Sequence, residues 1–252
     1  MSDARPTRTA TLAKALRRAQ TAPPPEAAAH ADLPRMRARM IAALEEDAFV
    51  SQDVLDAMAR VPRHRFVPLP LRARAYAPMT TLPIGFGQTI SQPLTVARMT
   101  TALELFPSSS VLEIGTGSGY QAAVLAHLAR QVHTLERLPQ LARRAAALLA
   151  ELGLDHVTTA LADGTLGAPA LAPFDAILVS AGGPSVPEAL LAQLAHGGRL
   201  VIPVGDRETQ RVLRVRRDGG RFTEEDLGPA RFVDLVGDAG WSRRPGWRDE
   251  AA

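Results

Sequence analysis

Residues 111–120 read V-L-E-I-G-T-G-S-G-Y and decide the fold, because a short apolar strand runs directly into three alternating glycines. Gly115, Gly117 and Gly119 lack a Cβ, so they can adopt positive φ and let a ligand approach the main chain closely. The free N–H groups and positive dipole end of a following helix would point back at that ligand. The stretch predicts a strand, a cofactor loop and a helix; a tight turn without a ligand is the alternative.

The glycine spacing separates two classes of cofactor loop. The dinucleotide fingerprint has glycine at its first, third and sixth places, but the sixth place counted from Gly115 is Tyr120. With its preceding glutamate, the run reads E-x-G-x-G-x-G and resembles the cofactor loop of S-adenosylmethionine-dependent methyltransferases. That resemblance implies that S-adenosyl-L-methionine is held by Glu113, Gly115, Thr116, Gly117, Ser118 and Gly119.

Length and composition limit the classes of protein to which this chain can belong. The 252 residues, 46% of them hydrophobic and 22% charged, suffice for one domain with a sizeable core. The absence of cysteine excludes disulfides, thiolate zinc sites and a cysteine nucleophile. No apolar run approaches the roughly 18 residues of a membrane span, and the first 20 residues lack the apolar centre of a signal peptide. We therefore expect a soluble, cytoplasmic protein with no membrane partner.

The positive charge is concentrated near the N-terminus. Residues 1–39 carry a net charge of +5, whereas the remainder carries −2. A basic arm of this kind either contacts nucleic acid or is simply solvated. Because the main domain has no basic excess, we expect no nucleic-acid partner.

Composition divides the chain into three parts. Residues 1–31 are rich in alanine, proline and arginine and lack core residues, which predicts a flexible extension. One domain is expected over 32–241, followed by a polar tail at 242–252. The domain should begin with two helices, the first with helical apolar spacing over 36–44 and the second with Ser51 as its N-cap.

Strand and helix patterns alternate from Val96 onward. The expected strands cover residues 111–115, 132–136, 157–163, 174–181 and 200–204, and the expected helices cover 120–130, 138–152 and 186–196. A capping box at Ser185 and Glu188 should open the last helix. Such alternation predicts an α/β fold with a doubly wound, mostly parallel sheet and helices on both faces. Two further strands, at 212–216 and 232–236, should pair antiparallel at the sheet edge.

In a doubly wound sheet the ligand lies beyond the carboxyl ends of the strands. Glu136 ends the second strand 21 residues after Gly115, near the spacing at which an acidic side chain binds ribose hydroxyls. Asp163 and Gly164 end the third strand, where a carboxylate and exposed main chain would recognise adenine. The alternative for Glu136 is a glutamate that only caps the next helix. The alternative for Asp163 and Gly164 is a plain turn.

Small residues at 180–184 follow the fourth strand and should leave room for a substrate. Methyltransferases that modify base amino groups usually place an Asn- or Asp-Pro-Pro-aromatic tetrad here. This chain has none, so we expect an acceptor other than an exocyclic base nitrogen.

A second polar segment lies upstream of the glycine loop. Residues 83–93, P-I-G-F-G-Q-T-I-S-Q-P, form either a polar clamp or an ordinary Gly/Pro-rich connection. Together with V-P-R-H-R-F-V-P at 61–68, the glycine loop and G-G-R-L-V-I-P-V-G at 197–205, they resemble bacterial protein-L-isoaspartate O-methyltransferases. The similarity extends from about residue 33 to residue 241 with matching spacing, and Q-T-I-S-Q-P is specific to that family among methyltransferases.

The resemblance implies a Rossmann-like class I methyltransferase with N-terminal helices and a role in protein repair. Isoaspartyl residues, which form when asparagine or aspartate rearranges, carry a free α-carboxylate. The enzyme would transfer the methyl group of S-adenosyl-L-methionine to that carboxylate, and the ester would convert through a succinimide toward aspartate. The resemblance further implies isoaspartyl-containing proteins and peptides as substrates, and a monomer. We also expect no metal site.

Ser91 is the residue that the resemblance places at the reacting carboxylate, with Gln88 and Thr89 positioning the substrate. We interpret Ser91 as a positioning donor, since no His/Asp pair is recognisable beside it. A carboxylate with a pKa of about 4 is already ionised at neutral pH, so alignment matters more than a strong base.

Two departures from the family border the expected substrate cleft and bear on peptide preference. Residues 180–183, S-A-G-G, stand where bacterial members commonly have Thr-Ala-Ala, and an acidic residue is usual near Pro78. His64 is either a functional imidazole or a residue that fixes its loop. The alternative functions are a methyltransferase for a small-molecule carboxylate or hydroxyl, and a non-catalytic binder of the cofactor.

Overall fold

The computed structural model describes residues 32–242, so the predicted extension at 1–31 and residues 243–252 of the predicted tail lie outside the described residues. The strands are β1 (Leu82–Gly85), β2 (Gln88–Ile90), β3 (Ser110–Ile114), β4 (Gln131–Glu136), β5 (Val157–Leu161), β6 (Phe174–Val179), β7 (Leu194–Gly205), β8 (Gln210–Asp218) and β9 (Arg221–Ala230). The α-helices are α3 (Leu33–Glu45), α4 (Gln52–Arg60), α5 (Pro93–Ala102), α6 (Tyr120–Ala126), α7 (Pro139–Glu151) and α8 (Glu188–Ala192).

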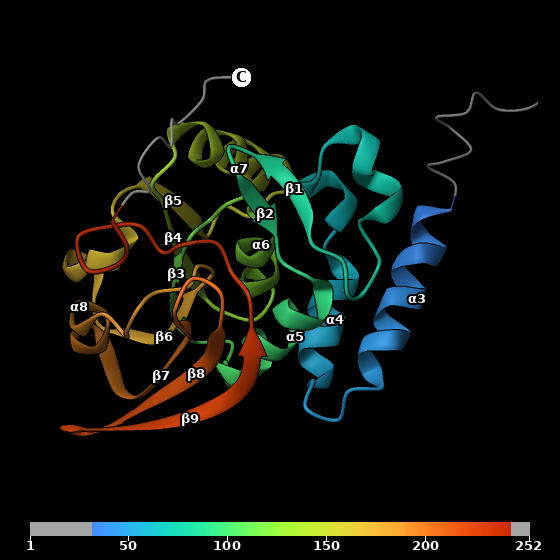
Figure 1. Ribbon diagram of the computed structural model, residues 1–252. Coiled ribbons are helices and arrows are strands. Elements are labelled where there is room, and N and C mark those ends of the chain that lie inside the picture. Colours follow the sequence, from blue (N-terminus) through green and yellow to red (C-terminus); the bar gives the residue numbers. More distant parts are fainter. Residues whose placement is uncertain (1–31, 243–252) are drawn as a thin grey trace, which may run out of the picture.

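Seven strands form one central sheet in the order β5-β4-β3-β6-β7-β8-β9, which runs from top to bottom in Figure 1. The strands from β3 to β7 are parallel, and β8 and β9 are antiparallel. The predicted doubly wound sheet with antiparallel edge strands is therefore confirmed. Because the chain leaves β3 toward β5 and later returns on the other side to β6, the strand order reverses between β3 and β6. Strand ends diverge into a crevice at such a reversal.

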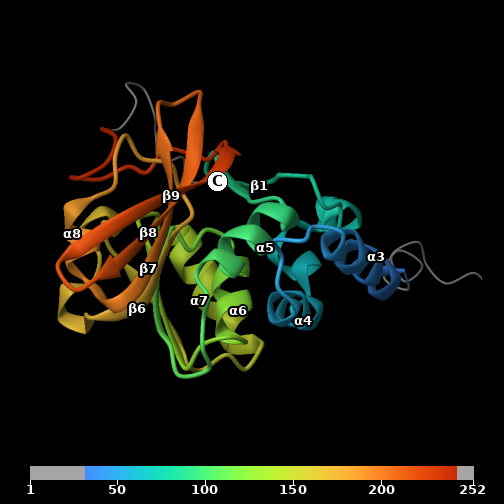
Figure 2. The same cartoon turned by 90° about the horizontal axis from the view of Figure 1, so that it is seen from below.

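Helices cover both faces of the sheet, which explains why its central strands are apolar almost throughout. On one face, Met99 of α5 and Leu125 of α6 pack with Val111 of β3. On the other, Leu190 of α8 packs with Ile177 of β6. Figure 2 shows α3 and α4 lying beyond α5 and α6, on the side away from β7 to β9.

The N-terminal helices lie where the apolar spacing predicts them. Ser51 occupies the N-cap position of α4, but its hydroxyl lies 3.3 Å from the Thr101 hydroxyl and does not cap the helix. The segment between α4 and α5 contains the 3₁₀-helices η1 (Arg63–Phe66) and η2 (Leu69–Arg74) and the antiparallel β1–β2 hairpin. None of the helices within residues 32–242 is both long and apolar enough to span a membrane.

The prediction of a helix over 186–196 is wrong in its second half. α8 ends at Ala192 and β7 begins at Leu194, because the side chain of Gln193 binds the main chain at Leu166 and Ala168 and turns the chain into the sheet. The capping box does not form either, since the N-cap residue is Pro187 and no side chain caps it.

The prediction of a strand at 232–236 is also wrong. A turn at Asp218–Arg221 folds β9 back onto β8, so the last strand lies at Arg221–Ala230. Residues 232–236 form only isolated bridges, from Asp234 to Gly182 and from Val236 to Trp241. The segment that was expected to extend the sheet instead crosses its carboxyl end.

Candidate functional site

A cavity opens at the crevice between β3 and β6. It lies between the glycine loop after β3, the end of β4, the β2 segment, and the residues that follow β6 and β9. The predicted site residues that line it are Gln88, Thr89, Ser91, Gly115, Thr116, Gly117, Ser118, Glu136 and Gly164. Glu113, Gly119 and Asp163 do not line it, so their contributions are indirect.

Gly119 shapes the turn from which α6 starts. It is the N-cap residue at a φ of 87°, a conformation that favours glycine. A Cβ at this position would lie 3.2 Å from the Cβ of Ala145, because α7 packs closely against the loop. Gly119 therefore holds the loop against α7 and does not itself face the cavity.

Glu136 ties the end of β4 to the glycine loop. Glu136 is 6% exposed, and its carboxylate accepts hydrogen bonds from the N–H of Gly117 at 2.8 Å and of Leu138 at 2.9 Å. Leu138 is the N-cap residue of α7, so Glu136 also serves the helix that follows. Each carboxylate oxygen can accept a second hydrogen bond, which leaves acceptor capacity for a ligand in the cavity.

Glu113 lies behind the loop and supports it through two threonines. Thr134 donates a hydrogen bond to the Glu113 carboxylate at 2.6 Å, and the Thr134 and Thr116 hydroxyls are 2.6 Å apart. Burial raises the pKa of Glu113 to about 8, although the hydrogen bond from Thr134 lowers it. Its other oxygen, Oε1, is buried and has no hydrogen-bond partner within the described part of the chain.

Asp163 and Gly164 have different surroundings. Asp163 accepts hydrogen bonds from the Thr165 N–H at 2.9 Å and the Asp238 N–H at 2.8 Å, so its carboxylate binds the protein's own main chain. Partial burial raises the pKa of Asp163, but these hydrogen bonds outweigh it and the pKa is lowered. Gly164 lines the cavity, and a Cβ there would overlap the Ile114 side chain. The main chain of Gly164 therefore presents this strand end to a ligand.

The sequence did not reveal the wall formed by residues 233–236. The Gly182 N–H donates to the Val233 carbonyl and the Leu235 N–H donates to the Gly182 carbonyl, both at 2.8 Å. Gly182 and Gly183 are consequently buried under this wall, and only Ser180 and Ala181 of the small residues line the cavity. The alternating apolar residues at 233–236 were the one sequence signal, and they suggested a strand.

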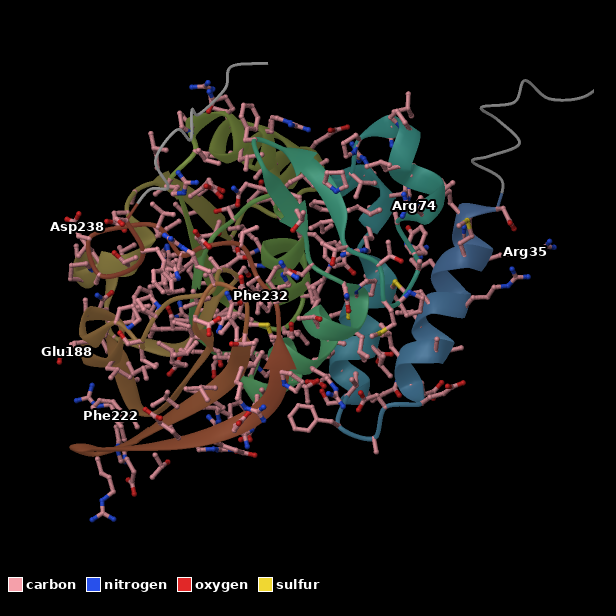
Figure 3. All side chains as sticks on the ribbon, in the orientation of Figure 1. Arg35, Arg74, Glu188, Phe222, Phe232 and Asp238 are labelled. Atoms are coloured by element: carbon pink, nitrogen blue, oxygen red, sulfur yellow. The ribbon has the colours of Figure 1, made fainter. Side chains whose placement is uncertain are left out.

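A second cleft adjoins the cavity on the side of the end of β9 and the residues that follow it. Its lining residues are Thr81, Thr89, Ser91, Gln92, Thr95, Ser180, Pro229, Ala230, Arg231, Phe232 and Val233. Figure 3 labels Phe232 near the middle of the molecule, between the sheet and the β1–β2 hairpin. Four residues line both the cavity and the second cleft and so form the boundary between these two hollows: Thr89, Ser91, Ser180 and Val233.

Ser91 stands at this boundary with a free hydroxyl. Its carbonyl accepts a hydrogen bond, but its hydroxyl has no hydrogen-bond partner among the residues that the structure describes. His64 lies in neither hollow, and its Nδ1 is 2.7 Å from the Tyr76 hydroxyl, which supports the structural alternative for this histidine.

The cavity suits a nucleoside cofactor. The glycine loop and Gly164 line it with main chain, and the Glu136 carboxylate supplies a hydrogen-bond acceptor beside them. The buried Oε1 of Glu113 is a polar atom without a hydrogen-bond partner behind the loop, among the residues that the structure describes. No group of three or more side chains that could hold a metal ion occurs within residues 32–242.

Comparisons with known proteins agree with this arrangement. The family model "Protein-L-isoaspartate(D-aspartate) O-methyltransferase" matches residues 35–240. A protein-L-isoaspartate O-methyltransferase of Roseiflexus castenholzii is 54% identical over 211 residues, which cover 84% of this chain and 96% of the relative. A solved protein-L-isoaspartate O-methyltransferase shares 26% identity at a TM-score of 0.73, covering 81% of this chain and 67% of its own.

A further solved structure, from Plasmodium falciparum, shows the same fold. It is described as a methyltransferase of this kind in complex with S-adenosyl-L-homocysteine. It shares 24% identity with this chain at a TM-score of 0.69, covering 79% of this chain and 97% of its own.

Proposed function

This chain belongs to the protein-L-isoaspartate(D-aspartate) O-methyltransferase family, and we propose that it repairs aged proteins with the site described above. It transfers the methyl group of S-adenosyl-L-methionine to the free α-carboxylate of L-isoaspartyl residues in damaged proteins and peptides. The ester then converts through a succinimide toward aspartate.

The observation that carries this proposal is the shared boundary of the two hollows. The inner cavity has the glycine loop and Glu136 of a nucleoside site, and the outer cleft has room for a peptide. A methyl group can pass between two bound molecules only where their binding sites meet. Here they meet at Ser91, Thr89 and Ser180.

The cofactor residues act in two ways. Glu136 accepts hydrogen bonds from the ribose, while Gly115, Thr116, Gly117, Ser118 and Gly164 form the surface against which the cofactor lies. Glu113 supports the loop through Thr134, and Asp163 fixes the turn that presents Gly164. When bound, S-adenosyl-L-methionine supplies a methyl group that is activated by a sulfonium.

On the acceptor side, the Ser91 hydroxyl orients the isoaspartyl carboxylate, and Gln88 and Thr89 position the substrate around it. The carboxylate is ionised at neutral pH, so these residues do not have to remove a proton. Orientation of the attacking oxygen toward the methyl carbon is then the main contribution of the protein.

A methyl-transfer assay tests the function. The purified protein is incubated with S-adenosyl-L-methionine and an isoaspartyl peptide, and in parallel with small-molecule carboxylates at equal concentration. We expect rapid transfer to the peptide alone. Transfer to the small carboxylates but not to the peptide would support the alternative methyltransferase, and no transfer would support a binder.

We also propose that the protein acts as a monomer in the cytoplasm, without nucleic acid or membrane. The absence of cysteine suits a reducing compartment, and the net charge of −2 outside residues 1–39 leaves that part of the chain without a basic excess for binding a polyanion. Light scattering during size exclusion would give the mass of one chain, 26.9 kDa, if the assembly is a monomer.

A further inference from the structure

A buried cation lies beneath the acceptor side of the site. Arg63 is 0% exposed, and it donates hydrogen bonds from Nε to the Ala75 carbonyl at 2.7 Å and from Nη2 to the Ser91 carbonyl at 2.6 Å. Its guanidinium carbon lies 4.5 Å from the ring centre of Tyr120, the first residue of α6. Arg63 thus joins the segment of Ser91 to the helix that follows the glycine loop.

This cation has no counter-ion within residues 32–242. The ion pairs of the described arginines do not include Arg63, and Nη1 is buried without a hydrogen-bond partner. Arg63 binds the Ala75 carbonyl, and the segment that begins there, Ala75–Pro78, contains no acidic residue. Burial lowers the pKa of Arg63, as expected for a charge removed from water, but an arginine remains protonated in proteins.

Two carbonyl dipoles and an aromatic face compensate a buried guanidinium only in part. The uncompensated field therefore extends to neighbouring groups, and Ser91 is one of them because its carbonyl accepts from Nη2. An anion bound at Ser91 would supply the missing negative charge. A cation bound in the same place would be disfavoured.

We propose that Arg63 is a positioning residue of the acceptor cleft, which fixes the Ser91 peptide unit and whose unpaired charge favours an anionic acceptor. The inference rests on the proposed function, since the acceptor there is the isoaspartyl α-carboxylate. The charge acts with opposite sign on the two ligands, because the acceptor is an anion and the donor carries a sulfonium. Loss of the charge should therefore weaken binding of the peptide without weakening binding of the cofactor.

Two substitutions of Arg63 separate its hold on the Ser91 peptide unit from the effect of its charge. Arg63→Lys keeps the charge but cannot hold the two carbonyls with a planar fork, so we expect kcat to fall about tenfold with little change in the KM of the peptide. Arg63→Met removes the charge at similar length, so we expect the KM of an isoaspartyl peptide to rise about tenfold. For both variants, the Kd of S-adenosylhomocysteine should stay within about twofold of wild type.

Arg65→Met is the matched control. Arg65 lies in the same short helix but is partly exposed and paired with Glu151 at 2.5 Å. We expect it to keep the kcat and KM of wild type, and circular dichroism and melting temperatures establish that each variant is folded.

Folded Arg63 variants with the kcat and KM of wild type would overturn the inference, and so would an equal loss of affinity for peptide and cofactor. If Arg63→Met does not fold, the kcat-against-KM split of Arg63→Lys decides alone. A wild-type protein that fails to methylate the isoaspartyl peptide would instead overturn the proposed function.

Discussion

Replacing Glu113 by glutamine removes an ionisable group from directly behind the glycine loop. Glu113 is 0% exposed on β3, and burial raises the pKa of its carboxyl to about 8. The hydrogen bond from Thr134 lowers this pKa, and the nearby charge of Glu136 raises it. The carboxyl is therefore mostly protonated at neutral pH in the folded protein, and a glutamine amide imitates that neutral form.

The effect on stability depends on pH, because the folded and unfolded chains lose this proton in different ranges. The unfolded carboxyl ionises around its ordinary pKa of 4.5 and the folded one around 8. Below the lower value both states are protonated, and stability is unaffected. As the pH rises from 4.5 to about 8, the free energy of unfolding falls, and above this range the loss is complete. A shift of this size corresponds to a loss of about 5 kcal/mol.

We would unfold wild type and Glu113→Gln in urea at about pH 5 and about pH 9 and monitor the unfolding by circular dichroism. The experiment measures the difference in free energy of unfolding between the two proteins at each pH. We expect the two proteins to agree within about 1 kcal/mol at the lower pH. At the higher pH the variant should be more stable by several kcal/mol. If the free energies of unfolding of the two proteins change equally with pH, the carboxyl is not held neutral in the folded state and the reasoning is refuted.

Further substitutions test the remaining walls of the site. Glu136→Ala should weaken the binding of S-adenosylhomocysteine by about 1.5 to 3 kcal/mol, measured by calorimetry, because a charge-assisted hydrogen bond is lost. Unchanged affinity would remove Glu136 from the cofactor site. Ser91→Ala should lower kcat by up to about 10²-fold at unchanged cofactor affinity, whereas lost cofactor binding would reassign Ser91 to the cofactor cavity. Gly164→Ala should lower the unfolding free energy by about 1 to 3 kcal/mol in urea, because its Cβ overlaps Ile114; a stability equal to wild type would contradict this packing. Deleting residues 1–31, which precede the matched residues 35–240, should leave the steady-state activity intact, and a large loss would show that the domain needs them.

The sequence predicted the sheet correctly where strands are short and apolar and are followed by clear helices. The prediction failed where a contact between residues far apart in the sequence determines where an element ends. The helix expected over 186–196 stops because Gln193 binds main chain near Leu166, some 27 residues earlier. β9 was missed because an edge strand with one face in solvent, R-F-T-E-E-D-L-G-P-A, needs no apolar run.

The same limit applies to the site. Residues of the glycine loop and of Gln88–Ser91 could be predicted because they are consecutive and carry a local pattern. The burial of Glu113 and the binding of Asp163 to Asp238 depend on which elements pack above them, and no local pattern records that. The wall at 233–236 was likewise invisible, since its role arises only from hydrogen bonds to Gly182.

Methylation of a matched pair of peptides addresses the isoaspartyl specificity itself. An isoaspartyl peptide and its aspartyl twin are incubated separately with the protein and S-adenosyl-L-methionine, and tandem mass spectrometry locates the methyl group. We expect one methyl group on the α-carboxylate of the isoaspartyl residue, none on the twin, and gradual appearance of aspartyl peptide on further incubation. Equal methylation of the twin, or a methyl group on another carboxylate of the peptide, would contradict the proposed function.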